Sequence, residues 1–368
     1  MTVSIQVTKT YLPPLADYAH YLERAWANNQ VTNNGPLVTE LEQRIKEHLG
    51  VKHFFLVNNG TIALMLAIKA LDLRGDVITT PFSYVATVSS LVWQTCRPIF
   101  VDIDPQTLCL DPARIESAIT SSTTGILATH VYGHPCDVDA IHRIAQKRNL
   151  RVLYDAAHTF GVRYQGEALA HWGTASALSF HATKLFHTGE GGGIVTDHDE
   201  IAARVIALRN FGHNGAETFS GIGINGKCSE LNAAMGLAIL PKVPELIAKR
   251  KEASQHYERL LEGIPGLSRP RCRPGTEYTY AYFPVLFPSE EALFATRSAL
   301  NAHHIFPRRY FYPSLNTLNY VAYQPTPIAE DIARRVLCLP LHHALPLEDI
   351  EKITRIIRHS LESACPPK

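Results

Sequence analysis

Lys184 is the residue of this sequence with the strongest indication of a chemical role. It ends the run Ser179-Phe180-His181-Ala182-Thr183-Lys184, and the glycine-rich turn Gly189-Glu190-Gly191-Gly192-Gly193 follows shortly after. Burial disfavours the charged form of a lysine and leaves a nucleophilic amine. Such an amine can form a Schiff base with a carbonyl-bearing cofactor. Most lysines are solvated surface residues, so the interpretation depends on what else the chain supplies.

Two further candidates follow expected strands. In Asn59-Gly60-Thr61, the glycine would let the backbone approach an anion, and the start of the next helix would direct free N–H groups toward it. Thr61 adds a hydroxyl. A helix N-cap without any ligand is the alternative interpretation. Tyr84 could stack on a flat heterocycle, although packing in the core would also explain an aromatic residue there.

Asp155 ends another apolar strand, and His158 lies three residues later. A partly buried carboxylate needs a cationic partner. A protonated pyridine nitrogen is such a partner, and the carboxylate would raise the pKa of that nitrogen. His158 could pack beside the ring or bind its substituents. A helix-capping aspartate and a structural histidine are the alternatives.

Ser179 could bind a phosphate, whereas Asn232, at an expected helix start, is of a type that usually caps. In chain order the candidates supply an anion cradle, a ring stacker, a partner for a ring nitrogen and a Schiff-base amine. Together they predict a site for pyridoxal 5′-phosphate (PLP).

Alternating strands and helices would position these residues. From residue 52 onward the alternation predicts a parallel sheet with right-handed crossovers, which binds ligands at the carboxyl ends of its strands. The expected strands are 53–57, 77–79, 98–101, 125–129, 151–154, 176–180, 193–196 and one near 278–286. The expected helices are 17–28, 37–49, 62–71, 86–95, 112–120, 138–148, 201–210, 231–240, 244–261, 289–303 and 347–363.

Composition bounds the remaining possibilities. A chain of 368 residues with 46% hydrophobic and 19% charged residues is typical of a globular protein with two domains. We place the domains at 1–245 and 246–368. The net charge is +1, and Lys249-Arg250-Lys251 is best interpreted as the solvated face of a helix, so we expect no nucleic-acid partner.

The seven cysteines form no CxxC pair, which favours a reducing cytoplasm and no zinc site. Met1–Val7 lacks the pattern of a signal peptide. No apolar run approaches the ~20 residues that span a bilayer, so we expect no membrane association.

At this point the sequence resembles the DegT/DnrJ/StrS family of nucleotide-sugar aminotransferases, which belongs to the aspartate-aminotransferase superfamily. The resemblance covers about residues 8–360. The motifs that carry it are Asn59-Gly60-Thr61, Phe100-Val101-Asp102-Ile103-Asp104, His130-Val131-Tyr132-Gly133, Asp155-Ala156-Ala157-His158, Ser179-Phe180 with Lys184, Thr188-Gly189-Glu190-Gly191-Gly192 and Gly223-Ile224-Asn225-Gly226-Lys227. It implies an α/β, aspartate-aminotransferase-like fold (fold type I), with a mostly parallel sheet between helices in the large domain and a smaller C-terminal α/β domain.

The resemblance also implies roles for individual residues. Lys184 matches the Schiff-base lysine and proton carrier, and its presence argues against the dehydratases of the family, which carry histidine there. Asp155 matches the partner of the pyridine nitrogen, and His158 the neighbour of the ring's 3-hydroxyl. The residues that match phosphate or ring contacts are Gly60, Thr61, Ser179 and Tyr84. Asn232 matches an asparagine that reaches the cofactor of the other subunit, which implies a homodimer with shared active sites.

The implied reaction moves an amino group from L-glutamate to a nucleotide-linked keto-deoxysugar for polysaccharide (O-antigen) or glycoside biosynthesis. The stretch Arg308-Arg309-Tyr310-Phe311-Tyr312-Pro313 looks most like transaminases of dTDP-4-keto-6-deoxyhexoses, so we expect amination at C4. Candidate substrate contacts are His187, His213, Arg308, Arg309 and Tyr310, and ordinary structural or surface roles are equally compatible with them. The alternatives are amination at C3, a PLP-dependent lyase or aldolase, and a non-catalytic PLP-binding regulator.

Overall fold

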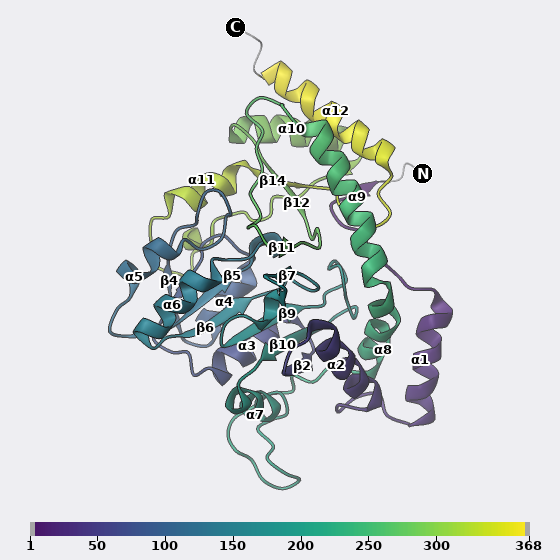
Figure 1. Ribbon diagram of the computed structural model, residues 1–368, viewed down its shortest axis with the longest axis vertical. Coiled ribbons are helices and arrows are strands. Elements are labelled where there is room, and N and C mark those ends of the chain that lie inside the picture. The colour runs from purple at the N-terminus through teal and green to yellow at the C-terminus, as the bar shows by residue number, and fades with distance from the viewer. Residues whose placement is uncertain (1–3, 365–368) are drawn as a thin grey trace.

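A seven-stranded sheet lies at the centre of the computed structural model, which describes residues 4–364 (Figure 1). Met1–Val3 and Cys365, which entered the sequence analysis, lie outside the described residues. Each strand of this sheet lies within two residues of an expected one. In spatial order the strands are β2 (His53–Val57), β10 (Gly192–Thr196), β9 (Ala175–Ser179), β6 (Arg151–Asp155), β5 (Thr123–Thr129), β3 (Asp76–Thr79) and β4 (Arg97–Phe100).

Most of the sheet is parallel. Parallel pairing joins β4, β3, β5, β6 and β9, whereas β10 pairs antiparallel with both β9 and β2. Only residues 180–191 separate β9 from β10, and a chain that returns directly places the next strand antiparallel. The predicted α/β class with a mostly parallel sheet is confirmed.

Helices cover both faces of this sheet, because alternate strand residues point to opposite sides. In β2, Phe55 and Val57 pack with the helices α3 and α7, whereas Phe54 and Leu56 pack with α2 and α8. The helices of this part are α1 (Leu15–Ala27), α2 (Pro36–Leu49), α3 (Gly60–Ala70), α4 (Val85–Trp93), α5 (Ile115–Ala118), α6 (Val138–Arg148), α7 (Asp199–Leu208) and α8 (Glu230–Ile239).

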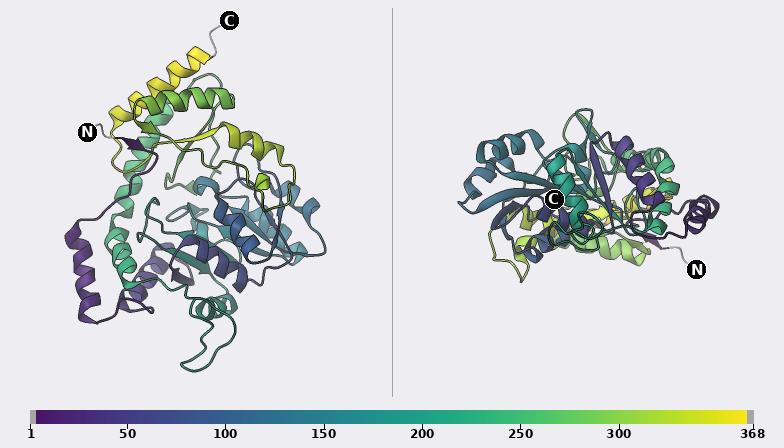
Figure 2. Two further views of the ribbon diagram at one scale, coloured as in Figure 1. Left: turned by 180° about the vertical axis from the view of Figure 1, so that it is seen from behind. Right: turned by 90° about the horizontal axis from the view of Figure 1, so that it is seen from below.

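The C-terminal elements gather at one end of the molecule, opposite the loop that follows α7 (Figures 1 and 2). Their helices are α9 (Val243–Leu261), α10 (Glu290–Ala302), α11 (Pro327–Arg335) and α12 (Leu347–Ala364). Among the short strands, β12 (Phe283–Leu286) pairs with β14 (Val336–Leu339), β11 (Thr276–Glu277) and β8 (Glu167–Ala168) flank β7 (Arg163–Tyr164), and β1 (Ile5–Gln6) pairs with β13 (Ile305–Phe306).

The start of the chain therefore pairs with its C-terminal part. Helix α9 begins in the core beside α2 and α8, with Val243 and Leu246, and continues into the C-terminal core, with Ala253 and Tyr257. The division that we proposed after residue 245 falls inside this helix. The stretch Glu230–Leu261 is long and apolar enough to cross a membrane by length and composition, but half of its most apolar window is buried inside the structure.

Arg250 corrects one expectation. We interpreted its surroundings as a solvated helix face, but Arg250 is only 4% exposed. Its Nη1 donates to the backbone carbonyls of Tyr280, at 3.3 Å, and Ala281, at 3.1 Å. Burial lowers the pKa of this guanidinium to about 10. Carbonyl acceptors, which periodicity does not reveal, make burial of this arginine possible.

Two element predictions also need correction. The expected helix 112–120 reaches only to Ala118, after a single 3-10 turn, because Thr120 then bonds to Asp76 on another strand. The expected strand 278–286 is confined to β12, since Tyr280 has a φ of 55° and interrupts the extended backbone. Helix α11 and strand β14 were not predicted.

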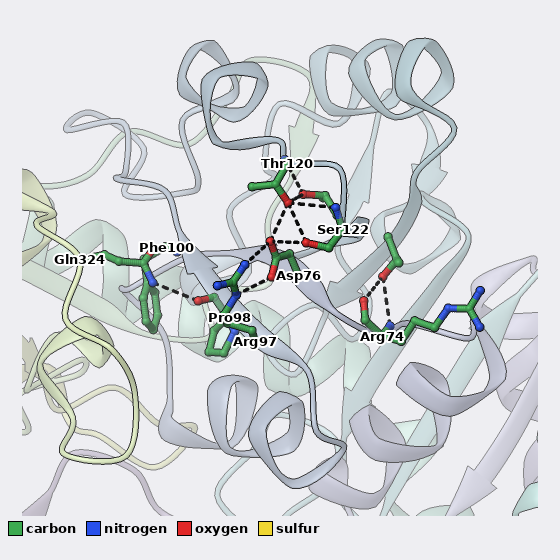
Figure 3. Close-up of polar contacts among 10 residues, drawn as sticks. Arg74, Asp76, Arg97, Pro98, Phe100, Thr120, Ser122 and Gln324 are labelled. Atoms are coloured by element: carbon green, nitrogen blue, oxygen red, sulfur yellow. Dashed lines mark hydrogen bonds and ion pairs between the residues drawn. The ribbon is translucent and has the colours of Figure 1, made fainter.

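An ion pair between the exposed Arg97 and the buried Asp76 fixes the start of β3 (Figure 3). Arg97 binds both carboxylate oxygens of Asp76, at 2.5 and 2.7 Å, and Thr120 and Ser122 donate to one of them. These hydrogen bonds, that from Arg97 first, hold the pKa of Asp76 well below its usual range. This cluster lies at the amino end of the strand, so it braces the sheet at the end opposite the carboxyl edge.

The two outer strands of the sheet are also bonded. The backbone N–H of Phe100 donates to Oε1 of Gln324 at 2.9 Å, and Nε2 of Gln324 donates to the carbonyl of Pro98 at 3.1 Å (Figure 3). At the other edge, the N–H of Asn58, just after β2, donates to the carbonyl of Gly226 at 3.1 Å. Loops from distant parts of the chain therefore bond to both edges of the sheet.

Candidate active site

A cavity of about 270 Å³ opens at the carboxyl ends of the parallel strands. Its wall combines the ends of β5, β6 and β9 with the start of α3 and with residues from the C-terminal part. Eight sequence-predicted residues line it: Gly60, Thr61, Tyr84, Asp155, His158, Ser179, Lys184 and Tyr310. The fold thus brings these residues together.

One end of the cavity is built to accept an anion. Helix α3 begins at Gly60, and the side chain of Asn59 caps it by accepting from the N–H of Ile62 at 2.8 Å. A Cβ atom on Gly60 would lie 2.8 Å from Cβ of Ser179, and one on Gly192 would lie 2.5 Å from the backbone of Asn59. Only glycine permits this approach of two strands to a helix start, where free N–H groups and the helix dipole favour negative charge.

Asp155 lies at the end of β6 and is only 5% exposed. Its Oδ1 accepts from the N–H of Ala157 at 3.1 Å, and its Oδ2 accepts from the hydroxyl of Thr87 at 2.7 Å. Burial raises the pKa of Asp155, and the two hydrogen bonds and the charge of Lys184 oppose that rise. A carboxylate has further acceptor capacity, which remains for a cationic group in the cavity.

Lys184 follows β9 in a short turn, where its N–H donates to the carbonyl of His181 at 2.9 Å. Burial lowers the pKa of Lys184 to about 8, although the negative charge of Asp155 opposes this. The hydroxyl of Tyr282 lies 3.5 Å from its Nζ atom. At neutral pH a larger fraction of this amine is therefore deprotonated than in an ordinary solvated lysine.

His158 is held between rings of the C-terminal part. It stacks on Phe311, with ring centres 5.8 Å apart and planes at 4°, and meets Tyr282 edge-on at 4.9 Å. Burial moves the pKa of His158 well below its usual value, so the imidazole is neutral. Its Nδ1 atom is buried without a hydrogen-bond partner among the described residues, as expected of a group that awaits a ligand.

Two aromatic residues lie at the rim. Tyr84 precedes α4 and is 58% exposed, so its ring is available to stack on a ligand. Tyr310 lines the cavity and meets the Tyr282 ring edge-on at 5.5 Å.

His187 and Arg309 do not line this cavity. Nε2 of His187 bonds the carbonyl of Tyr11 at 2.7 Å, and its Nδ1 accepts from the N–H of Gly189 at 3.1 Å. Both ring nitrogens are thus occupied by backbone groups. Arg309 donates to Glu290 at 2.7 Å and to the carbonyl of Arg334 at 3.0 Å. Within the described chain, both residues hold structure together instead of facing the cavity.

Arg308, His213 and Asn232 also lie outside the cavity wall. Arg308 is exposed and its backbone pairs with Cys338. His213 packs against Phe219 in the loop after α7, far from the C-terminal helices (Figure 1). The side-chain amide of Asn232 donates to the carbonyls of Thr188 and Glu190, each at 2.8 Å, so within this chain it braces the glycine-rich turn.

Sequence reasoning missed several residues of the cavity. Ser83, Thr129 and Tyr282 line it, and Thr87 lies directly behind Asp155. Ser83 and Thr87 belong to the same strand-end segment as Tyr84, and this position was a usable signal. Tyr282 has no local signal, because its relation to Lys184 arises from packing of the C-terminal part.

The residues of the cavity fit PLP by their own chemistry. The close approach at Gly60 suits a phosphate, the Asp155 carboxylate suits a protonated ring nitrogen, and the orphan nitrogen of His158 suits a ring substituent. Lys184 lies on the same wall as an amine of lowered pKa.

Comparisons with known proteins cover nearly the whole chain. A sequence model of the DegT/DnrJ/EryC1/StrS aminotransferase family matches residues 16–358. A dTDP-4-amino-4,6-dideoxy-D-glucose transaminase from Shigella dysenteriae is 45% identical over 367 residues, which covers 97% of this chain and 99% of that protein. A protein of the same name from Escherichia coli is 38% identical, with 96% and 98% covered.

A solved structure has the same fold. The crystal structure of DesI in the presence of its TDP-sugar product superposes with a TM-score of 0.93 at 33% sequence identity, and the match covers 98% of this chain and 94% of that one.

Proposed function

We propose that this chain, which belongs to the DegT/DnrJ/EryC1/StrS aminotransferase family, aminates dTDP-4-keto-6-deoxy-D-glucose at C4 to give dTDP-4-amino-4,6-dideoxy-D-glucose. Its reaction class is that of a PLP-dependent sugar-nucleotide transaminase. Support for the narrower substrate comes from the two relatives that are named for this amino sugar and match along almost their full length. The product would serve polysaccharide (O-antigen) or glycoside biosynthesis.

The observation that carries this proposal is the shared cavity of Lys184, Asp155 and the start of α3. Bound PLP supplies a carbonyl carbon and an electron-accepting ring. Gly60, Thr61 and Ser179 would hold its phosphate, and Asp155 would keep a proton on its ring nitrogen. His158 would bind the ring substituent through its unpartnered Nδ1.

Lys184 would carry the proton of the reaction. Its Nζ would move a proton from the α-carbon of the amino donor, which we propose to be L-glutamate, to the C4′ carbon of the cofactor. In the second half of the cycle it would move a proton from C4′ to C4 of the sugar. A base works best when its pKa lies near the working pH, and burial lowers the pKa of Lys184 to about 8.

We further propose that the sugar nucleotide enters past Tyr84 and Tyr310, with Arg308 pairing with the diphosphate. Tyr310 lines the cavity, and Arg308, two residues earlier in the chain, is exposed. A guanidinium matches phosphate geometry well. Arg309 is occupied by Glu290, so we assign the diphosphate to Arg308 alone.

A homodimer with shared active sites is also part of the proposal. Exposed apolar residues support it: Leu15 and Trp26 on α1, and Phe219 and Ile222 in the loop after α7. Patches of this kind mark interaction surfaces. The loop carries His213, which would reach the partner's cavity. A cytoplasmic location is proposed as well, because the six described cysteines are free thiols.

The deciding experiment separates the two half-reactions. The purified protein with PLP is first treated with L-glutamate alone, and conversion of the cofactor to its amine form is followed by absorbance. Keto-sugar nucleotides with ketones at C4 or C3 are then added, and NMR locates the new nitrogen. Nitrogen at C4 of the dTDP-sugar is expected. Nitrogen at C3 would overturn the proposed substrate and position of amination. Failure of the glutamate step would overturn the proposal that L-glutamate is the donor.

A further inference from the structure

A chain of buried hydroxyls leads to the Asp155 carboxylate. Thr129, at the end of β5, donates to Oγ of Ser83 at 3.0 Å. Ser83, in the loop after β3, bonds Oγ1 of Thr87 at 2.7 Å, and Thr87 on α4 donates to Oδ2 of Asp155 at 2.7 Å. All four side chains are buried, and Thr87 is fully so. Two segments far apart in sequence thus converge on one carboxylate oxygen.

The direction of these hydrogen bonds follows from counting protons. An ionised carboxylate only accepts, so the single hydroxyl proton of Thr87 points to Asp155. The bond between Thr87 and Ser83 must then use the proton of Ser83. The bond between Ser83 and Thr129 must likewise use the proton of Thr129. Every donor therefore points toward Asp155, and bonds aligned in this way polarise one another.

We propose that the Thr129–Ser83–Thr87 chain is a positioning device that keeps the buried Asp155 ionised and fixes the orientation of its carboxylate in the cavity. Its partner in the loaded enzyme would be the protonated ring nitrogen, and this part rests on the proposed function. A protonated Asp155 would be a weaker acceptor for the Thr87 hydroxyl than the ionised carboxylate, so the chain of hydroxyls favours the ionised form.

The electrostatic setting makes such a device necessary. Burial raises the pKa of Asp155, and the hydrogen bond from Thr87 is the strongest influence that lowers it. The titratable groups that share its cavity wall include His158, Lys184, Tyr282 and Tyr84. His158 is neutral, and the positive charge of Lys184 depends on a pKa of about 8. Thr87 supplies a donor that does not titrate.

Thr87 also offers a clean variant, because it does not line the cavity. Thr87→Val keeps the shape of the side chain and removes the donor, and Thr87→Ser keeps the donor. Ser90→Ala is the matched control. Ser90 lies on the same helix and is equally buried, but its hydroxyl has no partner among the described residues.

The test is a titration of Asp155 in the cofactor-free protein. Aspartate labelled with ¹³C at the side-chain carboxyl is incorporated, and Asp155→Asn identifies the signal. Thr87→Val should raise the pKa of Asp155 by about one to two units, since a hydrogen bond to a charged group is lost. Thr87→Ser and Ser90→Ala should leave it near the wild-type value. The Kd of PLP at pH 7 should rise on the order of tenfold in Thr87→Val only.

An unchanged pKa of Asp155 in folded Thr87→Val would overturn the proposal. Equal shifts in Thr87→Val and Thr87→Ser would also overturn it, because the hydroxyl would not be the cause. If Thr87→Val does not fold, Ser83→Ala breaks the chain one link further out. Ser83→Ala should raise the pKa of Asp155 by less than Thr87→Val would. No rise in that pKa would contradict the proposed role of the hydroxyl chain. The titration involves no substrate and no PLP, so its outcome is independent of the proposed reaction.

Discussion

The hydroxyl oxygen of Tyr282 lies 3.5 Å from Nζ of Lys184, and the ring centre of Tyr282 lies 5.8 Å from the same nitrogen. Burial raises the pKa of Tyr282 well above that of an ordinary tyrosine, so its hydroxyl is neutral at physiological pH. The two residues come from different parts of the chain. A neutral hydroxyl from the C-terminal part therefore lies within hydrogen-bonding distance of the Lys184 amine.

Tyr282→Phe should lower kcat about fivefold, because the lost hydrogen bond is worth about 1 kcal/mol and the amine loses its orientation. Steady-state kinetics with L-glutamate and the keto-sugar nucleotide would measure this. Tyr257→Phe is the control, since the hydroxyl of Tyr257 is buried in the C-terminal core without a partner among the described residues. Equal kcat values for both variants would contradict the role of Tyr282.

Lys184→Ala should reduce turnover by more than about 10³-fold, because the proton carrier is lost. The same variant should release PLP on desalting, which absorbance of the retained cofactor would measure. Lys249→Ala removes an exposed lysine that pairs with Glu245 and should behave like the wild type. Normal turnover of Lys184→Ala would refute the assignment of the base.

The rate at which the cofactor-free protein takes up PLP should rise with pH and level off above about 8. Below that value Lys184 is an ammonium ion without a free electron pair, and above it the amine is the main form. Stopped-flow absorbance between pH 7 and 9.5 would follow the reaction. N-acetyl-lysine in solution is the reference, and its midpoint should lie near the ordinary lysine pKa of about 10.4. A midpoint shared by protein and reference would contradict the effect of burial on Lys184.

Arg308 and Arg309 should differ sharply despite their adjacency. Arg309→Met should lower the free energy of unfolding by about 3 kcal/mol. The substitution leaves the Glu290 carboxylate without its cationic partner and the carbonyl of Ala333 without its donor. Arg308→Met should leave stability unchanged and raise the KM of the sugar nucleotide. Denaturant unfolding and steady-state kinetics, measured on both variants, would separate the two effects. The reverse pattern would show that Arg309 binds the diphosphate.

The strand-end residues of the site were predictable because parallel strands place their carboxyl ends together. Gly60, Asp155 and Lys184 could each be placed from a local pattern, and their order predicted the cofactor. Arg308 and Arg309 could not be told apart in this way. Their backbone runs beside β14, a strand that was not predicted, and this pairing leaves Arg308 exposed while Arg309 turns to Glu290.

Contacts between distant segments account for the other differences. His187 is occupied by the carbonyl of Tyr11, and Thr87 on α4 reaches Asp155 at the end of β6. Neither partner lies within the window in which a helix or strand period can be recognised. Tyr282 is similar, since only the packed C-terminal part brings it to Lys184.

The bonded edges of the central sheet have a consequence for behaviour at high concentration. An uncovered outer strand is a template on which a second chain can add, and repeated addition leads to fibrils. The amide of Gln324 bonds the N–H of Phe100 and the carbonyl of Pro98 in β4, and the carbonyl of Gly226 accepts from Asn58 just beyond β2. These two loop residues therefore oppose the addition of a second chain at the outer strands of the sheet.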